Sequence, residues 1–179
     1  MDPAERESAI IVPIKLPAAL AAIRQLETVD GPLGVPGHVT VLYPFAPPAS
    51  IDEGVLAAVA AVVAAVPAFD AWFTEVRRFE PDAGSPEGVV WLAPEPEARF
   101  TALIAALTKA FPAFPPFGGR YDTVIPHATL AALDRRHAAA VEAAARRWLP
   151  FRRRVGAATL IVEGADGRWR TRRRFPLGT

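Results

Sequence analysis

A His-x-Thr tripeptide occurs twice in this chain, each time inside a short apolar segment. The first copy runs from His38 to Thr40, and the second, 89 residues later, runs from His127 to Thr129. Both segments are rich in Val, Leu, Ile or Ala and lie between Pro or Gly and Pro or Asp, which is typical of a buried strand. Side chains two positions apart on a strand point to the same face. The sequence therefore predicts two strands that each present one imidazole and one hydroxyl on a shared face.

The other expected elements follow one another in a repeated order. The pattern predicts strands at residues 8–15, 69–79, 89–92, 151–163 and 168–175, and helices at 17–29, 51–65, 94–111 and 134–149. Strand, helix, His-x-Thr strand, helix and strand thus occur twice, which indicates an internal duplication. We expect a single domain over residues 1–179 with two pseudo-repeated lobes, at about 1–85 and 86–179. Helices packed outside one or two sheets give an α+β or α/β class.

Several helices carry recognisable start or packing signals. Ser50, followed three residues later by Glu53, forms a capping-box pattern for the second helix. Asp134 is the expected N-cap of the last helix. The first helix carries an apolar stripe with the three-and-four spacing of a buried face, made by Leu20, Ile23 and Leu26.

The composition excludes several classes of protein. The chain has 179 residues, 51% of them apolar, but no run of 18 uncharged apolar residues, and its N-terminus is acidic and polar. We therefore expect neither a transmembrane helix nor a signal peptide, and a cytoplasmic monomer without a membrane partner. The absence of cysteine excludes disulfides, thiolate zinc sites and a cysteine nucleophile. Three histidines remain as proton carriers near neutral pH.

Positive charge is concentrated near the C-terminus. Twelve of the 20 Lys and Arg residues, but three of the 19 Asp and Glu residues, lie in residues 135–179. In the expected last strand, Arg168, Arg170, Arg172 and Arg174 would share one face. This row would either guide a phosphate-bearing substrate or protect a sheet edge from pairing with another chain.

Two imidazoles placed across a groove are suited to concerted acid–base chemistry. One neutral ring can take a proton while one protonated ring gives a proton, near pH 7. The neighbouring hydroxyls can donate to the non-bridging oxygens of a phosphate. Cleavage of a phosphodiester needs these groups, because one histidine must activate water or a ribose hydroxyl and the other must protonate the leaving oxygen. A single strand histidine is more often a hydrogen-bonded core residue, but two copies in matching contexts favour catalysis.

A metal site is the main alternative use of the histidines. His38, His127 and a carboxylate such as Asp122 could form a two-histidine, one-carboxylate site. Nothing at ligand spacing in the sequence supports this site, and no glycine-rich phosphate-binding loop is present. We therefore expect no metal and no cofactor.

The sequence resembles the two-histidine phosphoesterase superfamily, and within it the bacterial 2′,5′-RNA ligase or RNA 2′,3′-cyclic phosphodiesterase branch. The segments that carry the resemblance are residues 11–13, 36–45, 90–94, 118–121 and 126–131. The resemblance implies a bilobal, pseudo-twofold α+β fold with antiparallel sheets around a central cleft and helices outside. It also implies that His38 and His127 are the catalytic pair and that Thr40 and Thr129 hold the phosphate.

The same resemblance implies metal-independent hydrolysis, or reversible ligation, at 2′-linked phosphates. An RNA end or a small cyclic phosphodiester would be the substrate. Arg120 and Tyr121, which precede the second motif, are expected to bind substrate at the mouth of the cleft. The alternative is a phosphate-binding or RNA-binding module that keeps the same cleft without turnover.

Overall fold

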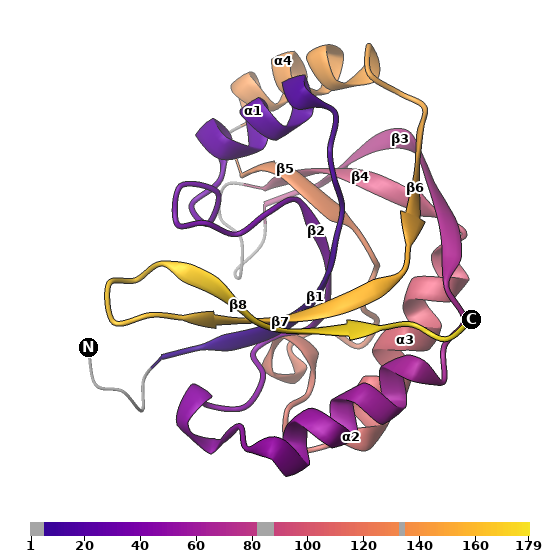
Figure 1. The fold of residues 1–179 in the computed structure, drawn as a ribbon. Helices are drawn as coiled ribbons and strands as arrows, with labels where there is room; N and C mark the ends of the chain where they lie inside the picture. The colour runs from indigo at the N-terminus through magenta and orange to yellow at the C-terminus, as the bar shows by residue number, and fades with distance from the viewer. Residues whose placement is uncertain (1–5, 82–87, 133–134) are drawn as a thin grey trace.

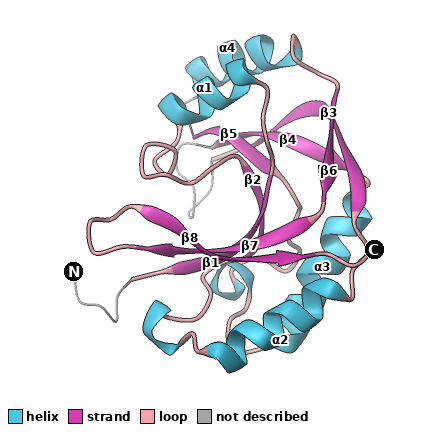
Figure 2. Cartoon of the chain, viewed as in Figure 1, coloured by secondary structure: helices cyan, strands magenta, loops and turns pink. Residues whose placement is uncertain are grey.

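The computed structural model describes residues 6–81, 88–132 and 135–179. Within them the strands are β1 (Ser8–Pro13), β2 (His38–Leu42), β3 (Phe69–Phe79), β4 (Val89–Glu95), β5 (Ala128–Ala132), β6 (Phe151–Val155), β7 (Ala157–Glu163) and β8 (Trp169–Pro176). The helices are α1 (Ala18–Glu27), α2 (Glu53–Ala64), α3 (Glu97–Ala110) and α4 (Arg135–Arg146), with short 3-10 turns η2 (Pro48–Ser50) and η3 (Pro116–Gly119). Figures 1 and 2 show their arrangement.

The strands form two antiparallel sheets that meet at the His-x-Thr strands. The β2 sheet has the order β2-β1-β7-β8, and the β5 sheet has the order β5-β4-β3-β6. Strand β2 contacts β5, so the two motifs lie at the junction of the sheets. Helices α2 and α3 pack below the β2 sheet in Figure 1, while α1 and α4 pack above the β5 sheet. This arrangement confirms the predicted α+β class with antiparallel sheets and outer helices.

The two sheets do not correspond to the two halves of the sequence. The chain was expected to divide near residue 85, but β3 joins β4, β5 and β6, whereas β7 and β8 return to β1 and β2. The segment 151–163, predicted as one strand, is two strands separated by Gly156. Strand β6 pairs with β3, and β7 pairs with β1. A glycine inside a strand pattern often marks a bend, and the prediction of one continuous strand missed the bend at Gly156.

Alternation along the two motif strands follows the prediction. Val39 and Val41 on β2 are buried, with 0% and 1% of their surface exposed, and Ala128 and Leu130 on β5 are both fully buried. These side chains belong to one hydrophobic cluster that takes residues from both sheets and from α1, α2 and α3. The shared core fixes the two lobes against each other and leaves the opposite faces of β2 and β5 available for a site.

The helix starts and stripes differ in detail from the prediction. The N-cap of α2 is Asp52, whose carboxylate accepts a hydrogen bond from Val55 N at 2.9 Å. The predicted cap, Ser50, lies one turn earlier and its hydroxyl donates to a main-chain carbonyl of that turn. The carboxylate is a strong cap and lies closer to the helix. The other predicted cap, Asp134, lies outside the described residues.

Helix α1 buries a different face from the predicted one. Leu20 is fully buried, but Leu26 is 78% exposed, so its predicted place in the buried stripe was wrong. Arg24, one turn after Leu20, is 3% exposed instead.

No helix in the described part of the chain combines the length and the apolar character that crossing a membrane requires.

Candidate active site

The two histidines are held by hydrogen bonds of the same kind. The Nδ1 atom of His38 lies 2.8 Å from the carbonyl oxygen of Pro36, and Nδ1 of His127 lies 2.8 Å from that of Ile125. Because a carbonyl oxygen can only accept, Nδ1 carries the proton in both rings. The Nε2 atom of each neutral imidazole is therefore unprotonated and able to accept a proton.

The two threonines share a sheet face with the histidines. Thr40 pairs with Ile11 on β1, and its hydroxyl lies 3.1 Å from Nε2 of His38, to which it can donate. Thr129 pairs with Trp91 on β4. His127 itself immediately precedes β5, two positions before Thr129. The predicted set of two imidazoles and two hydroxyls is thus built on β2 and β5, the strands at the junction of the sheets.

Aromatic side chains enclose His127. The Phe79 ring meets the imidazole edge-on, with ring centroids 5.0 Å apart, and the Trp91 ring centroid lies 5.8 Å away. Phe79 and Trp91 are stacked on each other at 4.6 Å. These contacts fix the plane of the ring and remove water from it.

Burial makes both histidines weaker bases than a free imidazole. It lowers the pKa of His38 to about 4, with further lowering by the positive charge of Arg24 and by His127. Burial also lowers the pKa of His127. His127 and His38 are thus near enough to interact electrostatically. Both rings are therefore mainly neutral at pH 7, and an anion bound between them would raise the pKa of each.

Arg24 is a site component that the sequence did not reveal. Its Nη1 donates to the carbonyl oxygen of Thr129 at 3.0 Å, and its Nη2 forms an ion pair with Asp30 at 2.5 Å. Asp30 begins the loop that leads to His38, so one buried guanidinium links both motifs. The available signal was its position four residues after Leu20, on the buried face of α1.

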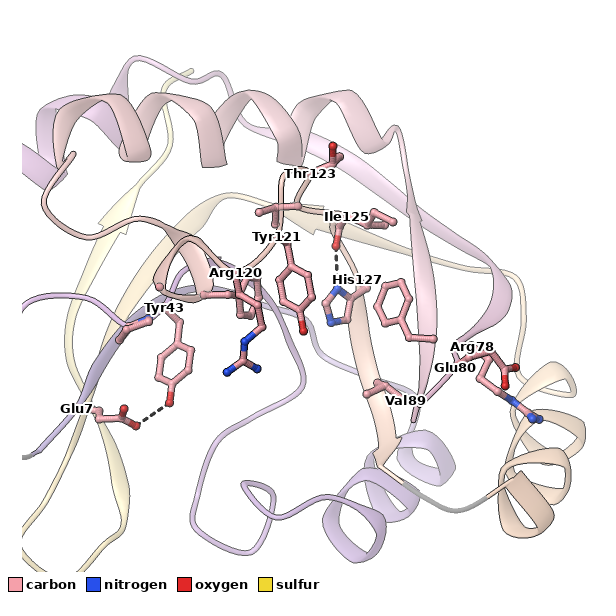
Figure 3. A pocket seen from close by; sticks show the side chains of 15 residues that line it. Glu7, Tyr43, Arg78, Glu80, Val89, Arg120, Tyr121, Thr123, Ile125 and His127 are labelled. Carbon is pink, nitrogen blue, oxygen red and sulfur yellow. Dashed lines mark hydrogen bonds between the residues drawn. The ribbon is translucent and has the colours of Figure 1, made fainter. Parts of the chain in front are cut away.

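A pocket of about 770 Å³ opens beside His127 (Figure 3). Arg120 and Tyr121, predicted to lie at the mouth of the cleft, both line it. Tyr43 and Phe117 add further aromatic surface, and Phe117 N donates to the carbonyl oxygen of Tyr43, which ties the η3 turn to the end of β2. Of the four predicted catalytic residues, His127 lines this pocket, whereas His38, Thr40 and Thr129 do not.

The row of arginines predicted on β8 is broken by a β-bulge. Leu160 pairs with Arg173 and Ile161 pairs with Thr171, so Arg172 is an extra residue in the ladder. Alternation is therefore out of phase on the two sides of the bulge, and the four arginines do not share a face. The sequence pattern could not reveal the bulge, because its regular alternation fits a regular strand equally well.

Two of these arginines have structural partners. Arg172 donates to the main-chain carbonyls of Pro48 at 2.7 Å and Ile51 at 2.6 Å, and so holds the start of α2. Arg170 forms an ion pair with Asp166 in the preceding turn at 2.6 Å. None of the four arginines lines the pocket beside His127.

The alternative metal set is not brought together. Among residues 6–81, 88–132 and 135–179, no three His, Asp or Glu side chains are grouped so that they could hold a metal ion. This applies to His38, His127 and Asp122, which all lie in that part of the chain.

Comparisons with known proteins agree with this fold. A family model described as the 2′-5′ RNA ligase superfamily matches residues 12–167. Among solved structures, TT0787 of Thermus thermophilus aligns with a TM-score of 0.56 and 22% identity over 95% of this chain and 97% of its own. Escherichia coli LigT in apo form aligns with a TM-score of 0.55 and 18% identity over 97% and 98%. LigT complexed with 3′-AMP gives 0.56 and 17% over 97% and 99%. No curated protein matches the chain.

Proposed function

The chain belongs to the 2′-5′ RNA ligase superfamily, and from this premise we propose that it is a metal-independent phosphodiesterase acting on 2′,3′-cyclic or other 2′-linked phosphodiesters. The observation that carries the proposal is the matched attachment of two imidazoles. Both donate from Nδ1 to a carbonyl two residues earlier, at 2.8 Å, and keep Nε2 for proton transfer. The same orientation of both rings provides the two proton-transfer groups that acid–base cleavage of a phosphodiester requires.

The proton transfers balance with these two groups alone. The Nε2 atom of the neutral histidine takes a proton from a water molecule as the water oxygen attacks the phosphorus of the cyclic diester. The bond from phosphorus to one ribose oxygen breaks, and the other histidine, protonated at Nε2, gives its proton to that oxygen. The pair ends with its proton on the opposite ring, and exchange with solvent restores the starting state. If a ribose hydroxyl attacks in place of water, the same steps join two nucleotides. In the reverse reaction that hydroxyl is the leaving group, so the ligation is reversible.

Binding of the substrate favours the protonated form of one histidine, which then acts as the acid. Burial lowers the pKa of both imidazoles. A phosphodiester anion placed against them favours the protonated form of a ring. Substrate binding therefore also prepares the acid, because a histidine holds the proton on its Nε2 atom best when the phosphate is present.

The threonine hydroxyls are proposed to hold the phosphate. The Thr40 hydroxyl lies 3.1 Å from Nε2 of His38, and rotation about its Cα–Cβ bond would turn it toward an oxygen of a phosphate bound between the rings. Thr129 has the equivalent place two positions after His127. Donors aimed at the oxygens where charge develops are a major source of rate enhancement.

Nucleotide ligands of a protein with the same fold support this substrate class. LigT was solved in complex with 3′-AMP, which is one of the two phosphomonoesters that opening of adenosine 2′,3′-cyclic phosphate can give. The comparison rests on fold alone at 17% identity, so the family match and the site geometry carry the argument.

The purified protein should be incubated with a panel of diesters in excess chelator. The panel contains 2′,3′-cyclic mononucleotides, an RNA bearing a 2′,3′-cyclic end and a 2′,5′-linked dinucleotide. We expect turnover of at least one 2′-linked member, unaffected by the chelator, and none of a 3′,5′-linked control. Binding of these ligands without any turnover would instead identify a non-catalytic phosphate-binding or RNA-binding module.

A further inference from the structure

The pocket beside His127 has two chemically different ends. Figure 3 shows His127 toward one end and Glu7 at the other, with Tyr43 and Tyr121 between them. A volume of about 770 Å³ lies within the range of small-ligand sites. One end can therefore take the phosphate while the other takes a different part of the same molecule.

Glu7 is held in place at its end of the pocket. Its Oε2 accepts a hydrogen bond from the hydroxyl of Tyr43 at 2.7 Å. Its main-chain oxygen accepts from Glu163 N at 2.9 Å, and its main-chain nitrogen lies 3.4 Å from the Glu163 carboxylate. Burial and the Glu7 carboxylate raise the pKa of Tyr43, so the phenol stays protonated as a donor. The half-buried carboxylate of Glu7 thus has a defined position.

A carboxylate in a phosphate-binding pocket restricts what can lie beside it. It repels a phosphate. Glu80 also lines the pocket, but so do the cationic side chains of Arg78 and Arg120, so the phosphate belongs near His127, away from Glu7. It accepts hydrogen bonds but donates none, and each of its oxygens can accept more than one. The ligand group at this end must therefore present N–H or O–H donors.

The aromatic lining narrows this group to a planar ring. Tyr43, Phe117 and Tyr121 line the pocket, and the rings of Phe117 and Tyr121 pack edge to face at 5.7 Å. Flat aromatic side chains of this kind stack on nucleobases. Among the four RNA bases, guanine presents two adjacent donors, N1–H and the N2 amino group, which fit the two oxygens of a carboxylate. Adenine and cytosine offer one amino group, and uracil one N–H.

We propose that Glu7 makes this enzyme selective for guanine, with the base stacked on the pocket's aromatic rings and hydrogen-bonded to the Glu7 carboxylate while the phosphate lies at the histidines. The inference rests on the proposed function for the position of the phosphate. It deepens that function by naming the nucleotide. Paired, charge-assisted hydrogen bonds of this kind are among the stronger ones in proteins.

The test compares the 2′,3′-cyclic phosphates of guanosine, adenosine, cytidine and uridine as substrates of the wild type, Glu7→Gln and Glu163→Gln. The wild type should favour guanosine over uridine by about 10- to 100-fold in kcat/KM, the discrimination of one paired base contact. Glu7→Gln replaces one acceptor by a donor and should reduce this ratio to about threefold or less. Glu163→Gln is the matched control, because it removes a neighbouring negative charge on a side chain that does not line the pocket, while the glutamine keeps an oxygen that can accept from Glu7 N. It should keep the wild-type ratio.

Binding of 3′-GMP and 3′-UMP, measured by titration calorimetry on the same proteins, separates this inference from the proposed function. Tighter binding of 3′-GMP that is lost in Glu7→Gln supports the inference even if no cyclic nucleotide is turned over. Equal binding of the two nucleotides by the wild type overturns it, even if all four cyclic substrates are hydrolysed. Retention of the preference in Glu7→Gln, or its equal loss in Glu163→Gln, would also overturn it.

Discussion

The two His-x-Thr strands hold their histidines alike but surround them differently. Each ring donates from Nδ1 to the carbonyl two residues earlier. Around His38 the neighbours are polar: the Thr40 hydroxyl lies at 3.1 Å, and the charges of Arg24 and Asp30 both act on the ring. His127 instead packs against two aromatic rings. The feature common to both strands, an oriented imidazole with an available Nε2, is the one that the chemistry requires.

The largest expected effect comes from removing either imidazole. His38→Ala and His127→Ala should each lower kcat/KM by about 10²- to 10⁴-fold, because each removes one proton transfer. Similar losses would show that the two different environments serve equivalent roles. His137→Ala is the matched control, since this third histidine is exposed on α4. Near wild-type activity in either variant would show that the imidazole it removes takes no part in proton transfer.

The hydroxyls should show the next largest effect. Thr40→Val and Thr129→Val keep the β-branched shape that suits a strand and remove the donor. Each should lower turnover by about 10- to 1000-fold, around the cost of one lost oxyanion donor, with little change in melting temperature. Unchanged kinetics in both variants would leave the hydroxyls with a structural role only.

Arg24 acts on the two motif strands in different ways. Its charge lowers the pKa of His38, while its hydrogen bond goes to the Thr129 carbonyl. Arg24→Met should raise the pKa of His38, measured by NMR titration. It should also cost about 2–3 kcal/mol of unfolding free energy, because charged hydrogen bonds are lost in a largely buried place. Arg24→Lys keeps the charge and should restore the pKa. An unmoved His38 in Arg24→Met would contradict this role.

The last effect concerns the dependence of the unfolding free energy on pH. The pKa of His38 is about 4 when folded and near 6.5 when unfolded, so the unfolded chain binds more protons between these values. Stability should therefore fall as the pH drops from 6.5 to 4, by at most about 1.4 kcal/mol per pH unit for this residue. Chemical denaturation across that range should show a shallower dependence in His38→Gln. Identical curves would place the ring in a more hydrated environment.

Local patterns in the sequence predicted the parts of the fold that depend on local physics. Alternation placed Val39 and Leu130 in the core and the motif side chains on the other face, because the two-residue period of a strand is intrinsic to the backbone. The pairing of β6 and β7 with different sheets could not be predicted, since it depends on contacts between residues far apart in the chain.

The same distinction applies to the site. The repeated motif identified the two histidines and two threonines, and the segment before the second motif identified Arg120 and Tyr121 as candidates. Arg24 and Glu7 were missed because their significance comes from tertiary partners, the Thr129 carbonyl and the Tyr43 hydroxyl. An arginine in a helix and a glutamate near a strand end carry no such information in the sequence.

The pH dependence of kcat/KM for a 2′,3′-cyclic nucleotide in excess chelator tests most directly whether the two imidazoles act as base and acid. We expect a bell-shaped profile for the wild type, with limbs that belong to the coupled pair. His38→Ala and His127→Ala should each lose one limb, and the lost limbs should lie on opposite sides. A bell-shaped profile that persists in either variant, or loss of the same limb in both, would show that the two imidazoles do not act as base and acid.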